Sequence, residues 1–249
     1  MSDPVHKTLL VFDIEKFGPR KHLEQAEAQR VMYDFFRQVL AKAEVEQTAA
    51  RVEDRGDGLF AVLDADVSKA KLIRSVLTEL PTALYDYNRL ASDSTKIRIR
   101  AAVHAGDVEI TDKGVVGTPA IEVFRLLNSK KLYAQLEASD EPLVFAVTDA
   151  IHRDVIRHDH SGVRADRFYP IDADDKDPQV AAWIYSPTLA GMAPRTDSPS
   201  SQPQPPAPAQ APAPAHTPTP TPTSGNFFSA GVTIHGGDIV AGNKTVNER

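Results

Sequence analysis

The sequence predicts an α+β fold, a ferredoxin-like βαββαβ antiparallel sheet with its helices on one face. Two observations predict it. Over residues 1–187, apolar runs of strand length alternate with stretches of helical periodicity, which is typical of a sheet covered by helices rather than of a helix bundle or an all-β fold. The elements also follow one another in the order βαββαβ, and this order is typical of a four-stranded antiparallel sheet with two covering helices.

The first half of this segment contains the strands and the helix with the clearest turn signals. In chain order we expect a strand over 7–12, a helix over 22–43 and strands over 48–54 and 59–63. The helix has an apolar stripe at helical spacing. The turn RGDG at 55–58 joins the last two strands, so they are expected to form a hairpin.

The second half begins with a helix over 70–87, whose apolar residues recur at helical spacing. Pro81 lies inside it and is expected to kink or interrupt the helix. The remaining elements are a strand over 97–103, a helix over 120–138, a strand over 143–147, and a short helix and two closing strands up to residue 185.

Composition limits the possible functions. The 249 residues include no cysteine, which excludes disulfides and thiolate metal sites and favours hard cations such as Mg²⁺ or Mn²⁺. The net charge of −6 gives no general argument for binding duplex nucleic acid. No segment approaches the ~20 apolar residues of a membrane span, and the first residues lack the apolar run of a secretory signal. We therefore expect a cytoplasmic protein.

Two further segments follow this domain. Residues 188–224 are rich in Pro, Ala and Thr and are expected to form a disordered linker, because they cannot bury enough apolar surface to fold. Residues 225–249 contain Gly-rich units of six residues, a short β-repeat pattern. Such units would bury their apolar face only against copies or another protein, with Phe227 and Phe228 as anchors. A disordered, sticky end is the equal alternative.

Two aspartates are candidate metal ligands. Asp13 ends the first strand, and Asp57 lies in the hairpin turn. In this topology the first strand and the hairpin are neighbours, so both carboxylates can reach one cation, as suits Mg²⁺. The backbone amides of residues 15–18 offer donors to a polyphosphate, and Gly18 and Gly56 allow close approach of the backbone. Either aspartate alone is common in turns, so the interpretation depends on the pair.

Four segments in order resemble the class III adenylate and guanylate cyclases. FDIEKF (12–17) and EDRGDGLFAVL (53–63) resemble the two metal-binding motifs, IRIRAAVHAGDV (97–108) resembles the strand that ends in His-x-Gly, and GTPAIEVFRLL (117–127) resembles the helix that carries the transition-state arginine. The resemblance covers residues 1–187. It implies an enzyme that converts a nucleoside triphosphate to a 3′,5′-cyclic monophosphate and pyrophosphate, with two Mg²⁺ or Mn²⁺ ions per site.

The resemblance also implies roles for individual residues. Arg125 would be the catalytic arginine, whereas His104 would be a hydrogen-bonded structural residue outside the site. The metal-site residues would be Asp13, Ile14 and Asp57, and the nucleotide-binding residues would be Glu15, Lys16, Phe17, Gly18, Glu53, Gly56 and Lys176. In family members the aspartates and the arginine come from opposite faces of the domain. A head-to-tail homodimer with two composite sites is therefore implied.

Three positions depart from the purine-specific pattern. Glu53 resembles the base-reading residue of guanylate cyclases, but the second base-reading position is Gly114, and Ile121 replaces an asparagine of the family. These losses resemble those of the bacterial antiphage Pycsar cyclases, which make cyclic CMP or cyclic UMP, and the Gly-Asp-Ile-Val-type tail resembles tails of bacterial conflict-system proteins. The leading hypothesis is therefore a pyrimidine cyclase in antiphage defence. A purine cyclase and a catalytically degenerate scaffold remain alternatives.

Overall fold

A computed structural model describes residues 3–172 and 181–187. The predicted linker, the tail with its anchors Phe227 and Phe228, and Lys176 lie outside the described residues. Within them, no helix has both the length and the apolar character needed to cross a membrane.

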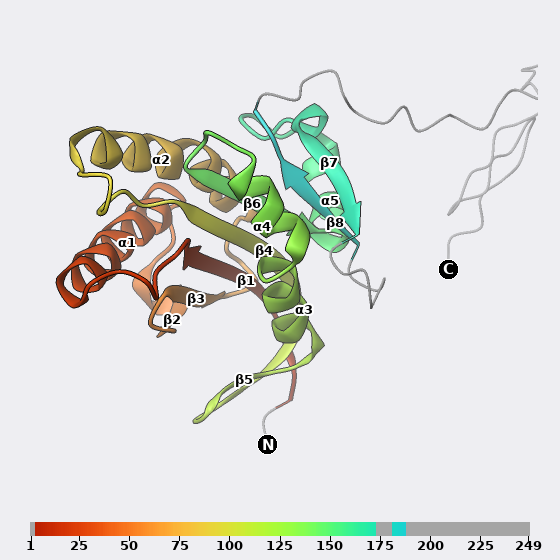
Figure 1. The fold of residues 1–249 in the computed structure, drawn as a ribbon. Helices are drawn as coiled ribbons and strands as arrows, with labels where there is room; N and C mark the ends of the chain where they lie inside the picture. Colours follow the sequence, from red (N-terminus) through yellow and green to blue (C-terminus); the bar gives the residue numbers. More distant parts are fainter. Residues whose placement is uncertain (1–2, 173–180, 188–249) are drawn as a thin grey trace, which may run out of the picture. The chain divides into compact units, whose positions relative to one another are not determined.

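The predicted ferredoxin-like arrangement is confirmed. The strands β1 (Val5–Ile14), β2 (Ala50–Asp54), β3 (Gly58–Leu63) and β4 (Ile99–Thr111) lie in the order β2-β3-β1-β4, and all neighbours are antiparallel (Figure 1). Beyond β4 the sheet continues with β6 (Leu143–Thr148), which is parallel to β4, and then with β8 (Ala181–Tyr185) and β7 (Phe168–Asp172). The end of β4 pairs with the short β5 (Gly114–Val116) in a hairpin that projects from the sheet (Figure 1).

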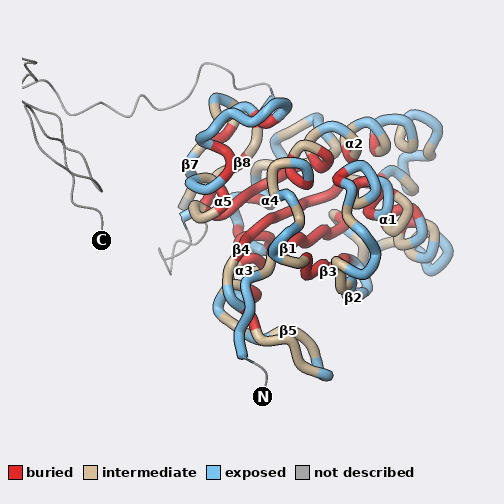
Figure 2. The backbone as a smooth tube through the Cα atoms, turned by 180° about the vertical axis from the view of Figure 1, so that it is seen from behind, coloured by how far each residue is buried: buried red, intermediate tan, exposed pale blue. Residues whose placement is uncertain are grey.

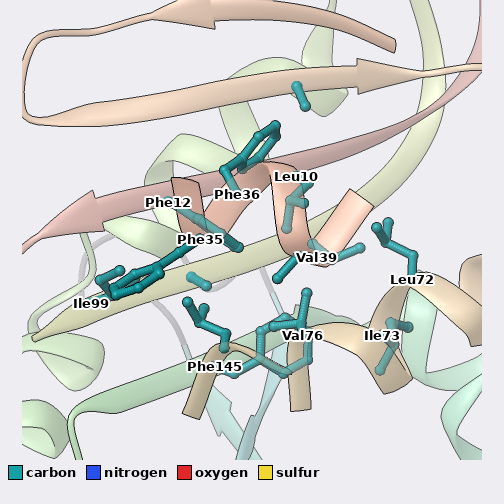
Figure 3. Packing of buried hydrophobic residues seen from close by; sticks show 14 of the residues in the cluster. Leu10, Phe12, Phe35, Phe36, Val39, Leu72, Ile73, Val76, Ile99 and Phe145 are labelled. Atoms are coloured by element: carbon teal, nitrogen blue, oxygen red, sulfur yellow. The ribbon is translucent and has the colours of Figure 1, made fainter. Parts of the chain in front are cut away.

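The first face of the sheet is covered by the two long helices, as predicted. The helices α1 (His22–Lys42) and α2 (Lys69–Leu90) form one core cluster with Leu10 and Phe12 of β1 (Figure 3). Ile14 of β1 belongs to the same cluster. Phe12 meets Phe36 of α1 edge to face, with ring centroids 5.3 Å apart. Alternate residues of a strand point to the same face of the sheet. Burial of these three β1 residues therefore specifies how β1 is aligned with its neighbouring strands.

The opposite face is covered as well. Leu9 and Val11 of β1 pack with a second pair of helices, α3 (Thr118–Leu127) and α4 (Lys130–Glu137). Figure 2 shows the result: β1, β3 and β4 form the buried centre of the sheet. The single helix expected over 120–138 is thus two helices. Its break has a local cause, because the hydroxyl of Ser129 accepts a hydrogen bond from the amide of Leu132 and caps a new helix.

The expected interruption at Pro81 is wrong, because α2 runs through this residue. The turns on both sides of the proline are anchored in the core: Leu80 and Leu84 are completely buried. Burial of these side chains offsets the backbone hydrogen bond that proline cannot make. The short helix α5 (Asp149–Asp154) and the 3₁₀ turns Gln47–Ala49, Ile156–His158 and Ala165–Arg167 complete the described elements.

Candidate functional site

Asp13 and Asp57 meet at one edge of the sheet. Asp13 is the penultimate residue of β1, and its side chain follows Leu9 and Val11 on the face covered by α3. Asp57 lies in the turn between β2 and β3, and the amide of Ile14 donates to its carbonyl oxygen at 2.9 Å. Both aspartates line a cavity of about 130 Å³. The structure therefore brings the two predicted metal ligands together.

Two glycines around Asp57 make this approach possible. Gly56 has a φ of +82°, a left-handed conformation that favours glycine. Gly58 lies directly beside β1, where a Cβ atom would overlap the carbonyl oxygen of Phe12. The close approach of backbones that we expected at Gly18 and Gly56 is thus found at Gly58, while a Cβ at Gly18 would meet open space.

Arg100 is a site residue that the sequence analysis missed. It pairs with Asp13 across β1 and β4, and its Nη2 donates to the Asp13 carboxylate. The two side chains are only 5% and 10% exposed, and the guanidinium lies 3.5 Å from the ring centroid of Tyr133. Its Nε and Nη1 atoms are buried and have no hydrogen-bond partner among the described residues. A buried guanidinium with unused donors in an acidic cavity is suited to bind an anion there.

A second, larger cavity of about 600 Å³ adjoins the first. The two cavities share Arg55, Phe124 and Asn128 in their walls. The larger one is mostly apolar, and it also contains Arg125 and Ile121. Arg125 and the two aspartates therefore line adjoining cavities on the α3 side of the sheet. The cause is that α3 folds back over β1, which places both groups on one side.

Glu53 is held by two arginines. Its Oε1 lies 3.2 Å from Nη2 of Arg51, and its Oε2 accepts from Nη2 of Arg55 at 2.9 Å. A Cβ atom at Gly114 would lie 4.0 Å from the same carboxylate. The two positions that the resemblance assigns to base reading are thus neighbours. In this chain the carboxylate forms ion pairs with both arginines, its Oε1 makes no hydrogen bond among the described residues, and the neighbouring position has no side chain.

Several groups of the predicted phosphate-binding residues already make contacts within the protein. The amide of Glu15 donates to the carbonyl oxygen of Arg98 at 2.9 Å, so it is not free for a ligand. The ring of Phe17 packs against the core. Lys16 has a φ of +53° and lines a separate cavity of about 450 Å³. At Gly56, the amide donates to Oδ1 of Asp54 at 2.6 Å. The β1–β4 ladder thus uses the amide of Glu15 and a local turn uses that of Gly56, and the nucleotide-binding role of the two residues stays a prediction.

His104 has the structural position that we expected. It is 6% exposed. Its Nδ1 lies 2.6 Å from Oγ1 of Thr148, and its Nε2 lies 2.9 Å from Oε2 of Glu122. The first contact joins β4 to β6, and the second joins β4 to α3, the helix that carries Arg125.

We expect His104 to make folding stability depend on pH. Burial lowers the pKa of His104 below its usual value of 6.5, although Glu122 opposes this effect. As the pH falls below about 6.5, the unfolded chain takes up a proton that the folded chain does not, so the free energy of unfolding decreases. Urea unfolding at pH 7.5 and 5.5 should show a smaller decrease for His104→Gln than for the unchanged chain.

Part of the decrease should remain in this variant. His152 stacks on Trp183 with ring centroids 3.5 Å apart, and burial lowers its pKa in the same way. An equal decrease in His104→Gln and in the unchanged chain would contradict the assignment.

The donor set of the acidic cavity fits a hard divalent cation. It offers the carboxylates of Asp13 and Asp57, while residues 3–172 and 181–187, this cavity included, contain no group of three or more His, Cys, Asp or Glu side chains that could hold a metal ion. Mg²⁺ commonly binds through one or two carboxylates and completes its shell with water and substrate phosphates. The adjacent donors of Arg100 suit such phosphates.

Known structures share this fold. Searches against protein-family models and against curated proteins give no match. Among solved structures, an adenylate/guanylate cyclase/hydrolase from Silicibacter pomeroyi aligns with a TM-score of 0.50 and 15% identity over 75% of this chain and 99% of that one. A bacterial light-regulated adenylyl cyclase aligns with a TM-score of 0.51 and 13% identity over 74% and 91% of the two chains. The chain therefore has the mixed α+β fold of adenylate and guanylate cyclase catalytic domains.

Proposed function

We propose that the chain is a nucleotidyl cyclase that converts a nucleoside triphosphate to a 3′,5′-cyclic monophosphate and pyrophosphate. The observation that carries this proposal is the cavity that combines Asp13, Asp57 and the buried guanidinium of Arg100. Carboxylates for a cation and unused N–H donors for an anion are together the requirements of a metal–triphosphate site.

The reaction would be an in-line displacement at the α-phosphorus. The ribose 3′-oxygen forms a bond to phosphorus, the bond to pyrophosphate breaks, and the hydroxyl proton passes to solvent. Asp13, Asp57 and the carbonyl of Ile14 would hold two Mg²⁺ or Mn²⁺ ions, which lower the pKa of the 3′-hydroxyl and neutralise the triphosphate when bound. Arg100 would hold phosphate oxygens, and Arg125 would stabilise the charge that develops on the α-phosphoryl group.

We further propose a homodimer with composite sites. Beside Arg125, Val116 and Ile121 are 57% and 54% exposed and line the larger cavity. Neighbouring exposed apolar side chains around a hollow are typical of a surface that another chain covers. A two-fold pair would place the larger cavity of each protomer against the acidic cavity of its partner. The tail, residues 225–249, is proposed as a further contact for self-assembly or for a protein partner.

For the substrate we propose a pyrimidine triphosphate, UTP or CTP. Glu53 forms ion pairs with Arg51 and Arg55, which orient its carboxylate toward these two cations, and its buried Oε1 has no hydrogen-bond partner among the described residues. Gly114 offers no side chain to a purine. With the resemblance to Pycsar cyclases, these features support a cyclic UMP or cyclic CMP messenger in antiphage defence in the cytoplasm.

The test is to incubate the purified chain with Mn²⁺ and each of the four nucleoside triphosphates and to identify the products by mass spectrometry. We expect cyclic UMP or cyclic CMP as the main product. Exclusive cyclisation of ATP or GTP would instead support a purine cyclase. The scaffold alternative, which the replacement at Ile121 favours, predicts no product from any triphosphate. In cells, phage infection should raise the cyclic pyrimidine level, and a chain without Asp57 should not respond.

A further inference from the structure

Arg55 occupies the wall between the two cavities. It precedes Asp57 by two residues in the hairpin turn, and it lines both the acidic cavity and the larger apolar one. If a triphosphate lies in the acidic cavity and its base extends toward the larger cavity of the same protomer, the nucleotide passes Arg55. Arg55 is thus placed beside the nucleobase rather than beside the reacting phosphorus.

Its guanidinium is oriented by three neighbours. The central carbon lies 5.6 Å from the ring centroid of Phe60 and 5.3 Å from that of Phe124. Nη2 donates to Oε2 of Glu53 at 2.9 Å. The backbone is fixed as well, because the amide of Arg55 donates to the carbonyl oxygen of Gly58 at 2.9 Å. A planar cation between aromatic faces is limited in its orientations, so its remaining N–H groups point in a restricted set of directions.

The same side chain remains accessible. It is 48% exposed, and the bond to Glu53 uses one of its five N–H donors. A role in packing alone would account for the aromatic contacts, but it would not account for a half-exposed guanidinium that borders both cavities. Accessible donors at this place suit a ligand that carries acceptor oxygens.

We infer that Arg55 selects the nucleobase by donating to a ring carbonyl oxygen. The inference rests on the proposed function and deepens it. A guanidinium offers donors and no acceptor, so it favours the carbonyl-bearing edge of uracil or guanine over the corresponding edge of cytosine or adenine, which carries an amino group. Uracil is the pyrimidine among these two preferred bases, so the proposed pyrimidine substrate would be UTP rather than CTP.

The test measures binding and therefore does not depend on turnover. We would titrate the full chain with α,β-methylene analogues of the four triphosphates in the presence of Mg²⁺, by calorimetry. The unchanged chain should bind the uracil and guanine analogues more tightly than the cytosine and adenine analogues, respectively, by a factor on the order of 10 to 100. In Arg55→Leu this factor should fall to about one, while inorganic tripolyphosphate should bind equally to both proteins.

Arg51→Leu is the matched control. Arg51 lies on the same hairpin and pairs with the same glutamate, but it lines neither cavity. The control removes the same charge and should keep the preference for carbonyl-bearing bases. Arg55→Lys also offers donors and no acceptor but lacks the planar fork, so it should keep part of the preference. Thermal unfolding of each variant checks that the hairpin remains folded.

The outcomes separate this inference from the proposed function. Preferential binding of the guanine analogue that depends on Arg55 would overturn the pyrimidine substrate and support the role of Arg55. A preference for amino-bearing bases, or a preference unchanged in Arg55→Leu, would overturn the role of Arg55. If none of the four analogues binds to the folded chain, both proposals are wrong.

Discussion

Replacing Asp57 with alanine is expected to lower triphosphate cyclisation at least about a thousandfold, because it removes one of the two carboxylates in the acidic cavity. The fold should tolerate this change. Asp57 is exposed, and the bond that joins the turn to Ile14 is made by the backbone carbonyl of residue 57, which alanine retains. Product formation at saturating Mn²⁺, with each triphosphate in turn, measures the effect.

Asp13 is a less informative target, although it lies in the same cavity. Its partner Arg100 is almost completely buried. Removing one member of a buried ion pair leaves an uncompensated charge and typically costs about 3–5 kcal/mol of stability. Loss of activity in Asp13→Ala would therefore combine a local and a global effect, whereas Asp57→Ala isolates the local one.

Two measurements complete the Asp57 experiment. Mn²⁺ binding in the absence of substrate, followed by electron paramagnetic resonance, should weaken in Asp57→Ala. Asp140→Ala, which changes an exposed carboxylate in a loop away from both cavities, should leave binding and activity unchanged. An Asp57→Ala chain that remains active would remove the basis of the proposed metal site.

Local signals predicted the two aspartates and the hairpin of the site. Asp13 follows an apolar strand, and Asp57 lies in a Gly-Asp-Gly turn, so strand order and turn chemistry alone placed them side by side. Arg51, Glu53 and Arg55 alternate along one hairpin strand and its turn. Because side chains alternate between the two faces of a strand, the sequence also predicts that these three residues share a face, where Glu53 pairs with the arginines.

Arg100 could not be found in this way. It lies 87 residues from Asp13 in the sequence, and the alternation of Ile97, Ile99 and Val103 assigns it only to the face opposite α1 and α2. That face would be solvated in a simple two-layer fold. It is buried because α3 and α4 cover it, which depends on how a long helical segment breaks at Ser129 and folds back. The hydrogen bond of the Glu15 amide was not predicted, because the β1–β4 ladder continues three residues beyond the predicted strand over 7–12.

Replacing Arg125 with alanine is expected to lower cyclisation by a factor of about 10² to 10³, the usual effect of removing one group that stabilises transition-state charge. Arg125 is exposed in the last turn of α3, while the next residues, Leu126 and Leu127, hold the helix in the core. The substitution should therefore leave α3 folded, which thermal unfolding checks. Arg125→Lys should recover only part of the rate, since a lysine cannot make the planar, two-pronged contact with phosphoryl oxygens.

A mixed dimer decides which protomer supplies this arginine. Because Arg125 and the aspartates line adjoining cavities on one side of the sheet, the arginine could in principle serve its own protomer or its partner. In a dimer of one Asp57→Ala chain and one Arg125→Ala chain, purified by two different tags, a composite arrangement leaves one site intact and one site doubly defective. Such a dimer should have about half the activity of the unchanged dimer. If each arginine acted within its own chain, every site would carry one defect and the mixed dimer would be as inactive as either parent. Recovery of activity would therefore support both the dimer and the supply of Arg125 by the partner, and its absence would place the complete site in a single protomer.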